Sequence, residues 1–126
     1  MAALARKILV VDDSKLLRDL MVALLTEDGY EVTAVENGAE ALDALAEPRP
    51  QPDLILLDLE MPVMGGAEFL QSAATQQRFH GMRVVVVSSS SLDDSTRIRP
   101  LARLAKPFTP QALLRVVGEY ALPRAG

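Results

Sequence analysis

The stretch Lys7-Ile-Leu-Val-Val-Asp-Asp-Ser14 gives the first indication of the fold. Its apolar run is continuous and does not alternate with polar residues. Such runs are typical of strands that are covered on both faces, as in a parallel sheet. Comparable runs recur along the chain, although the last is weaker, and we expect five strands: Lys7–Val11, Glu31–Val35, Asp53–Leu57, Arg83–Val87 and Leu101–Ala105.

Helical patterns lie between these runs. One buried helix face is indicated by five apolar residues at i, i+3, i+4, i+7 and i+8: Leu17, Leu20, Met21, Leu24 and Leu25. Gly29 is a stop signal after that helix, and Asn37-Gly38 begins a second helix that runs through Ala46. We expect a third helix over residues 66–77 and a last helix that begins at Thr109-Pro110. The alternation predicts an α/β protein with a doubly wound parallel sheet and helices on both faces.

Length and composition exclude several classes of protein. The 126 residues fit one domain, and 49% hydrophobic residues are enough to build a core. The net charge of −4 argues against non-specific binding to nucleic acid or to an anionic membrane surface. Without cysteine and with His80 as the one histidine, a disulfide framework and a zinc site of several imidazoles are excluded. The sequence contains no apolar run of about 18–20 residues and no secretory signal, so we expect a cytoplasmic protein or one domain of a longer one.

Polar side chains follow four of the expected strands. Asp12-Asp13 follows the first, Asp58 the third, Ser88 the fourth and Lys106-Pro107 the fifth. The carboxyl ends of parallel strands line one edge of a sheet, so these residues converge if their strands are neighbours. Each residue alone has a plainer explanation, because Asp and Ser often form turns or caps and lysine is usually solvated. The combination of all four is what favours a site.

The chemistry of such a cluster is specific. Clustered carboxylates repel one another and need a counter-ion. Oxygen ligands without Cys or His favour Mg²⁺, with Mn²⁺ or Ca²⁺ as substitutes. A carboxylate can also attack phosphorus, while a lysine and a hydroxyl hold the phosphoryl oxygens. The sequence therefore predicts phosphoryl transfer onto an aspartate.

At four places the chain resembles the receiver domain of two-component response regulators. The matching stretches occur in the family's order and cover nearly the whole chain: Lys7–Ser14, Asp53–Gly66, Val84–Ser88 and Lys106–Phe108. Asp58-Leu-Glu-Met-Pro62 and the run from Val84 to Ser89 look most like the receiver of the chemotaxis methylesterase, whereas the length is similar to that of the stand-alone chemotaxis regulator. The resemblance implies a flavodoxin-like, five-stranded sheet of order 2-1-3-4-5. It also implies a single receiver domain over residues 1–126, with a core of about 6–122.

The resemblance assigns the metal ligands and the acceptor. Asp58 is the expected phosphoacceptor, which attacks the phosphohistidine of a partner kinase. Asp13 and Asp58 are expected to ligate Mg²⁺ directly, with Mn²⁺ as a substitute. The backbone carbonyl of Glu60 is the expected third protein ligand, and Asp12 is expected to act through a metal-bound water.

Other residues are expected to stabilise the phosphoryl group or to switch. Lys106 pairs with Asp58 and then with the phosphoryl oxygens, and the Lys106-Pro107 bond is expected to be cis. Ser88 is expected to hydrogen-bond the phosphoryl group and to pull its loop, which includes Ser89, along with it. Arg103 stands where the family usually has a switch aromatic, so the usual coupling cannot operate in the same form.

The segment between the fourth and fifth strands also departs from the family. Ser88 and Lys106 are 18 positions apart (106 − 88), about one helical turn fewer than is usual. Pro100 limits the fourth helix further, and we expect it to be short, over about residues 92–97, or poorly ordered. Gly65 replaces a common Asp and loosens its turn.

The leading hypothesis is a phosphorylation-controlled switch that assists its own phosphorylation and dephosphorylation but has no separate catalytic domain. The expected phosphodonor is a sensor histidine kinase or a phosphotransfer protein. The sequence does not identify the downstream protein partner. We expect no direct binding to DNA or membrane. The sequence leaves both a monomer and a homodimer on activation as alternatives, because Arg97, Arg99 and Arg103 place unusual positive charge near the family's usual partner surface. The alternatives are the regulatory domain of a longer effector such as a chemotaxis methylesterase, a docking module without phosphotransfer, and a flavin-binding protein. A flavin-binding protein would need a phosphate-binding loop after the first strand, and the negative charge of Asp12-Asp13 at that place argues against it.

Overall fold

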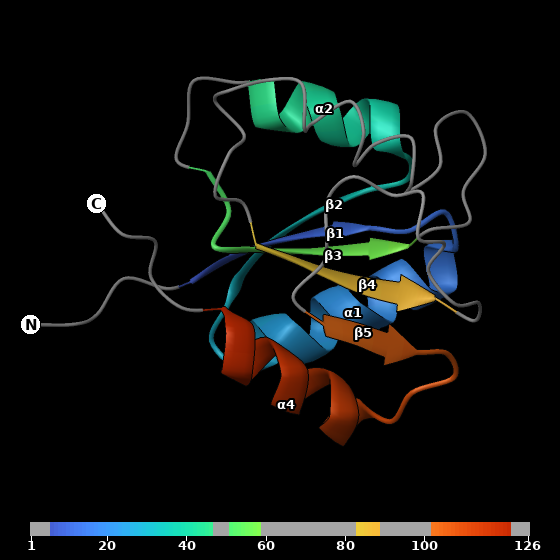
Figure 1. Cartoon of the computed structure of the whole chain (residues 1–126), viewed down its shortest axis with the longest axis vertical. Coiled ribbons are helices and arrows are strands. Elements are labelled where there is room, and N and C mark those ends of the chain that lie inside the picture. The colour runs from blue at the N-terminus through green and yellow to red at the C-terminus, as the bar shows by residue number, and fades with distance from the viewer. Residues whose placement is uncertain (1–5, 47–50, 59–82, 89–101, 122–126) are drawn as a thin grey trace, which may run out of the picture.

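Five strands and three helices make up the part of the chain that this computed structural model describes, which is residues 6–46, 51–58, 83–88 and 102–121 (Figure 1). The strands are β1 (Lys7–Val11), β2 (Glu31–Val35), β3 (Leu54–Asp58), β4 (Val84–Ser88) and β5 (Ala102–Ala105). The helices are α1 (Lys15–Glu27), α2 (Gly38–Ala46) and α4 (Pro110–Tyr120). The helices expected over residues 66–77 and 92–97 lie outside the described residues, as do Gly65, His80 and Pro100.

The strands form one parallel sheet of order β2-β1-β3-β4-β5, which confirms the expected topology. Strands β3 and β4 each begin and end one residue later than the sequence pattern indicated. The reason lies in the pairing, because Asp58 is paired with Val87 and Ser88 with Ala105. Asp58 and Ser88 are therefore the last residues of their strands, and the sheet itself fixes their backbones.

Helix α2 covers one face of the sheet, and α1 and α4 cover the other (Figure 1). Apolar side chains form a separate layer of core on each face. On one face, Leu9 and Ile55 pack with Ala41 and Leu45 of α2. On the other face, the core combines alternate strand residues with α1 and α4, among them Val10, Leu56, Met21, Leu25, Leu113 and Val117. The middle strands β1, β3 and β4 are buried almost throughout, which is why their sequences read as continuous apolar runs.

Helix α1 begins at a serine cap and buries a narrower face than its sequence suggests. The Ser14 hydroxyl accepts a hydrogen bond from the Leu17 N–H at 3.3 Å. Met21 and Leu25 are fully buried, but Leu20, which we expected on the same face, is 46% exposed. At about 100° per residue, Leu20 lies a full residue step around the helix from Met21, beyond the edge of the buried stripe.

The other helix boundaries agree with their sequence signals. Gly29 ends the turn after α1 with a φ of 96°, a backbone conformation that costs glycine little. The Asn37 side chain accepts a hydrogen bond from the Glu40 N–H at 2.9 Å at the start of α2. The Thr109 hydroxyl accepts one from the Ala112 N–H at 3.0 Å, and Pro110 occupies the first turn of α4. No helix in the described ranges is both long and apolar enough to cross a membrane.

Candidate functional site

Three carboxylates meet at the carboxyl edge of the sheet. Asp12 directly follows β1, Asp13 comes next, and Asp58 ends the neighbouring strand β3. One oxygen from each of the three side chains lies within 4.8 Å of the others. Asp12 is fully buried and Asp58 is 3% exposed, whereas Asp13 is exposed to solvent. The topology therefore brings the expected acidic residues together.

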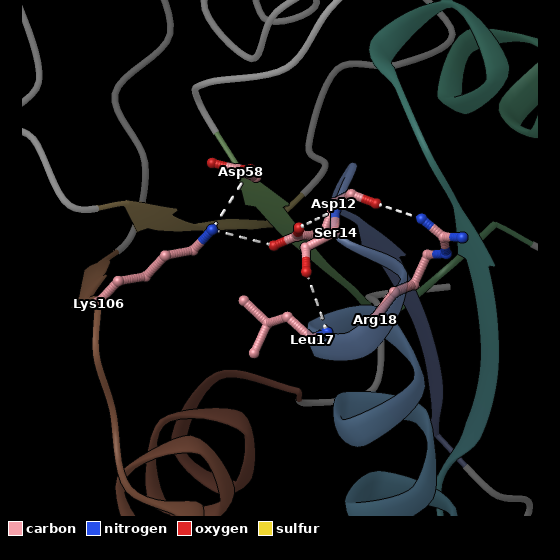
Figure 2. A network of polar contacts seen from close by, with 6 residues as sticks. All are labelled: Asp12, Ser14, Leu17, Arg18, Asp58 and Lys106. Atoms are coloured by element: carbon pink, nitrogen blue, oxygen red, sulfur yellow. Dashed lines mark hydrogen bonds and ion pairs between the residues drawn. The ribbon is translucent and has the colours of Figure 1, made fainter.

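Lys106 supplies a positive charge to this cluster. Its Nζ lies 3.2 Å from Asp12 Oδ2 and 3.3 Å from Asp58 Oδ2 (Figure 2). The lysine follows β5 directly, and its peptide bond to Pro107 is cis. Burial lowers the pKa of the Lys106 ammonium, but attraction to Asp12 and Asp58 more than offsets this and leaves the pKa above its ordinary value. Lys106 is therefore charged at neutral pH.

Asp12 is held in place by hydrogen bonds with four other residues. Its Oδ1 accepts the Ser14 main-chain N–H at 2.9 Å, while its Oδ2 faces Lys106. Its main-chain carbonyl accepts a hydrogen bond from Nη1 of Arg18 at 2.8 Å (Figure 2). Its own N–H donates to the carbonyl of Val35 at 3.1 Å. Both carboxylate oxygens of Asp12 thus have a donor already, and the side chain is oriented before any ligand arrives.

Ser88 closes the site at the end of β4 and is completely buried. Its main-chain carbonyl accepts two donors that both come from β5 or the residue after it. The Lys106 main-chain N–H lies at 3.1 Å, and Nη2 of the exposed Arg103 lies at 3.4 Å. The Ser88 backbone is therefore tied to the same segment that carries the lysine.

The donor set of the acidic cluster suits a hard divalent cation. Three carboxylates face one lysine ammonium, which leaves an excess of negative charge. The available ligand atoms are all oxygens, and the chain has no cysteine. Oxygen donors of this kind fit Mg²⁺, Mn²⁺ or Ca²⁺ and not a soft metal. The residues present could therefore hold Mg²⁺.

The residues predicted from sequence divide into two groups. The structure brings together Asp12, Asp13, Asp58, Lys106 and the backbone of Ser88, whereas Glu60 and Ser89 lie outside the described residues. Sequence reasoning missed the Ser14 N–H and the Arg18 guanidinium, which both orient Asp12. The Ser14 contact could have been found, because an aspartate at a turn often accepts the N–H of the residue two positions later. Arg18 carries no such signal, because its contact depends on how α1 packs against the end of β1.

A separate cavity of about 270 Å³ lies at the opposite end of the strands. It is lined by residues at the beginning of β1 and β2, by the end of α2 and by Gln51 and Pro52. None of the residues of the acidic cluster lines it. The candidate site is thus the edge of the sheet and not this cavity.

Comparisons with family models, curated proteins and solved structures all indicate the same family. A family model described as "Response regulator receiver domain" matches residues 8–118. The sporulation initiation phosphotransferase F of Bacillus subtilis is 31% identical over 118 residues, which are 90% of this chain and 92% of that protein. The chemotaxis response regulator CheY4 of Vibrio cholerae has a similar structure, with a TM-score of 0.81 and 28% identity over 94% of this chain and 100% of that one.

The methylesterase-like motifs correspond to a more partial match. The protein-glutamate methylesterase/protein-glutamine glutaminase of Agrobacterium fabrum is 44% identical over 90 residues, but these are 71% of this chain and 24% of that protein. The chain also spans about half the length of other curated relatives, which are transcriptional regulators. The family model and the relatives of similar length agree with the fold and with the residues gathered at the sheet edge, and the chain therefore belongs to the family of response regulator receiver domains.

Proposed function

We propose that this chain is a phosphorylation-controlled switch in which Asp58 accepts a phosphoryl group in a Mg²⁺-dependent reaction. One observation supports the proposal above all others. The Lys106 ammonium bridges the carboxylates of Asp12 and Asp58, and Asp13 completes an oxygen cluster around them. Such a cluster combines a nucleophile, a cation for phosphoryl oxygens and the ligands for a divalent metal.

Asp58 is placed to act as the nucleophile. It ends the central strand β3, so the sheet fixes its backbone while its side chain reaches the cluster. In the proposed reaction a carboxylate oxygen of Asp58 attacks phosphorus, the P–N bond of a partner's phosphohistidine breaks, and the electron pair of that bond returns to the imidazole nitrogen. The donor is a sensor histidine kinase or a phosphotransfer protein, as the family implies.

The metal would be held by Asp13 and Asp58 directly, with the Glu60 carbonyl as a third ligand and with Asp12 acting through a water. The contacts of Asp12 support this division of roles, because both of its oxygens already accept donors from Ser14 and Lys106. Asp13 is exposed and adjacent, as a direct ligand should be. Bound Mg²⁺ would offset the repulsion among the carboxylates and the incoming phosphoryl oxygens.

Lys106 and Ser88 would stabilise the phosphoryl group once it is on Asp58. The acyl phosphate carries close to two negative charges, about one more than the carboxylate that it replaces, and it adds strong acceptor oxygens. The ammonium of Lys106, at 3.3 Å from Asp58 Oδ2, is within reach of these oxygens. We propose that the Ser88 hydroxyl moves to them as well and that Ser89, Pro107 and Arg103 transmit the change to a downstream protein partner.

We also propose the extent, the location and the assembly of this domain. We take residues 1–126 as one receiver domain with a core of about 6–122, which acts in the cytoplasm and binds neither DNA nor membrane directly. A homodimer on activation and attachment to a longer effector, such as a methylesterase, are both compatible with this function. The relatives are compatible with a stand-alone receiver and with a longer effector, since some are of similar length and others are about twice as long. The proposed switch has no catalytic activity beyond its own phosphorylation and dephosphorylation.

Intact mass after incubation with acetyl phosphate tests this proposal. The wild type should gain one phosphoryl group with Mg²⁺ present and none after chelation. Asp58→Asn should gain none, whereas Asp53→Asn, directly before the same strand, should be modified like the wild type. A wild type that binds Mg²⁺ but acquires no adduct from either acetyl phosphate or a phosphorylated histidine kinase would leave the docking module as the better account.

A further inference from the structure

The carbonyl of Ser88 joins β4 to β5 through two unequal contacts. The Lys106 main-chain N–H donates to it at 3.1 Å and continues the ladder between the strands. Arg103 adds a guanidinium contact at 3.4 Å, which is long for an N–H···O hydrogen bond. The sheet pairing therefore persists without Arg103, and the guanidinium is the part of this junction that can leave.

Arg103 lies on the same face of the sheet as the Ser88 side chain. Successive residues of a strand alternate between faces. Val86 belongs to the core layer on the α2 side, so the Ser88 side chain, two residues later, points to that side too. Leu104 belongs to the opposite layer, so its neighbour Arg103 also faces the α2 side. The guanidinium is thus beside the hydroxyl that the proposed function assigns to the phosphoryl group.

The other cations of the described site already have fixed partners. The Lys106 ammonium is shared between Asp12 and Asp58, and Arg18 donates to the Asp12 carbonyl at the shorter distance of 2.8 Å. Arg103 is exposed and contacts only a neutral carbonyl in this part of the structure. Of these three cations, Arg103 gives up the least when it moves.

We propose that Arg103 binds the phosphoryl group, leaving the Ser88 carbonyl for the phosphoryl oxygens when Asp58 is modified. This inference rests on the proposed function of Asp58. Guanidinium binds phosphate through two parallel charge-assisted hydrogen bonds, which are roughly twice as strong as a bond between neutral groups. Asp58 pairs with Val87, so Ser88 lies only one residue further along the adjacent strand, and strands are about 4.8 Å apart. Asp58 follows Leu57 of the α2-side core layer, so its side chain starts on the other face, and the guanidinium would reach the phosphoryl group by passing over the end of β4. In this way β5 would sense the charge on β3.

The affinity for beryllium fluoride, a phosphoryl mimic on carboxylates, tests this inference in the full chain. Titrations in the presence of Mg²⁺ would be followed by fluorine NMR for the wild type and three variants. We expect about fivefold weaker binding for Arg103→Gln, an intermediate value for Arg103→Lys, and an unchanged value for Arg115→Gln. Arg115 is an exposed arginine of α4, and its replacement makes the same change in net charge.

Ionic strength separates direct binding from a merely structural role of Arg103. A cation that touches the anion is screened by salt, so the ratio of the Arg103→Gln and wild-type dissociation constants should fall toward one between about 0.05 and 0.5 M salt. A ratio independent of salt would overturn the inference, because loss of a neutral carbonyl contact would explain it. Equal affinities of wild type and Arg103→Gln would overturn it too. A wild type that neither binds beryllium fluoride nor accepts phosphate would overturn the proposed function itself, and the inference with it.

Discussion

Lys106 and Asp58 meet across the end of a strand that carries neither of them. Asp58 ends β3, Lys106 follows β5, and β4 lies between these two strands in the sheet. Two strand spacings of about 4.8 Å separate their backbones, yet Nζ and Oδ2 are 3.3 Å apart. Only a long side chain such as lysine can bridge this gap. The strand order therefore requires a long side chain after β5 at this position.

Replacement of Lys106 by methionine should destabilise the chain in the absence of Mg²⁺. The change leaves three carboxylates without their ammonium, two of them buried. We expect the free energy of unfolding to fall by about 1–2 kcal/mol in urea titrations, less than for a fully buried pair because Lys106 is 23% exposed. Lys15→Met is the matched control. It removes an exposed ion pair with Asp19 and should cost less than about 0.5 kcal/mol. Equal losses for both variants would contradict this account of the site.

The stabilisation by Lys106 should persist to high pH. The pKa of Lys106 in the folded chain is raised above the ordinary value of 10.5, so its contribution is complete below about that pH. It is then lost as pH rises through the higher pKa of the folded state. Tyr30, whose pKa burial also raises, titrates in the same region. The difference in unfolding free energy between wild type and Lys106→Met cancels the contribution of Tyr30. We expect this difference to be constant from pH 7 to about 10 and to shrink above; a decline that begins near pH 8 would argue that Lys106 is not held by the two carboxylates.

Asp13→Asn should have opposite effects with and without Mg²⁺. Without the metal, the variant loses repulsion between carboxylates less than 4.8 Å apart, and we expect it to gain up to about 1 kcal/mol of stability. With Mg²⁺, the wild type should be stabilised and the variant should not, because the variant lacks the proposed direct ligand. Asp43→Asn, an exposed acid of α2, should respond to Mg²⁺ as the wild type does. Full stabilisation of Asp13→Asn by Mg²⁺ would show that the ion binds elsewhere.

Replacing Gly29 or Gly118 by alanine should change the free energy of unfolding in opposite directions. Gly29 has a φ of +96°, which strains any residue with a Cβ, so Gly29→Ala should cost about 1 kcal/mol. Gly118 lies inside α4, and a Cβ there would come no closer than 4.0 Å to the Tyr30 hydroxyl. Gly118→Ala should therefore gain about 0.5–1 kcal/mol from helix propensity. Thermal or urea unfolding of the two variants checks both signs, and a stabilising Gly29→Ala would refute the assigned turn.

Sequence alone predicted the sheet because its central strands are buried on both faces. A strand that is covered on both faces needs an apolar side chain at each position. This gives continuous apolar runs such as Val84–Val87, which can be recognised in the sequence alone. The ends of the strands were less certain, because ladder pairing and not residue type extends β3 to Asp58 and β4 to Ser88. Leu20 was misplaced for a related reason, since apolar character does not show where the buried stripe of a helix ends.

The acidic cluster was also predictable, but the arginine contacts around it were not. Aspartates at strand ends are evident in the sequence, and the parallel topology converts them into neighbours. The contacts of Arg18 with the Asp12 carbonyl and of Arg103 with the Ser88 carbonyl have no pattern of their own. A long side chain that donates to a main-chain carbonyl depends on the position of the whole element that carries it.

We expect Asp58, and not its acidic neighbours, to carry the phosphoryl group. Borohydride reduces an aspartyl phosphate to homoserine with release of phosphate, which marks the modified position permanently. Peptide mass analysis of the phosphorylated and reduced chain measures that position directly. We predict homoserine at position 58 alone, and only when Mg²⁺ was present during phosphorylation. Homoserine at position 12 or 13, or a phosphorylated chain that yields no homoserine, would contradict the account.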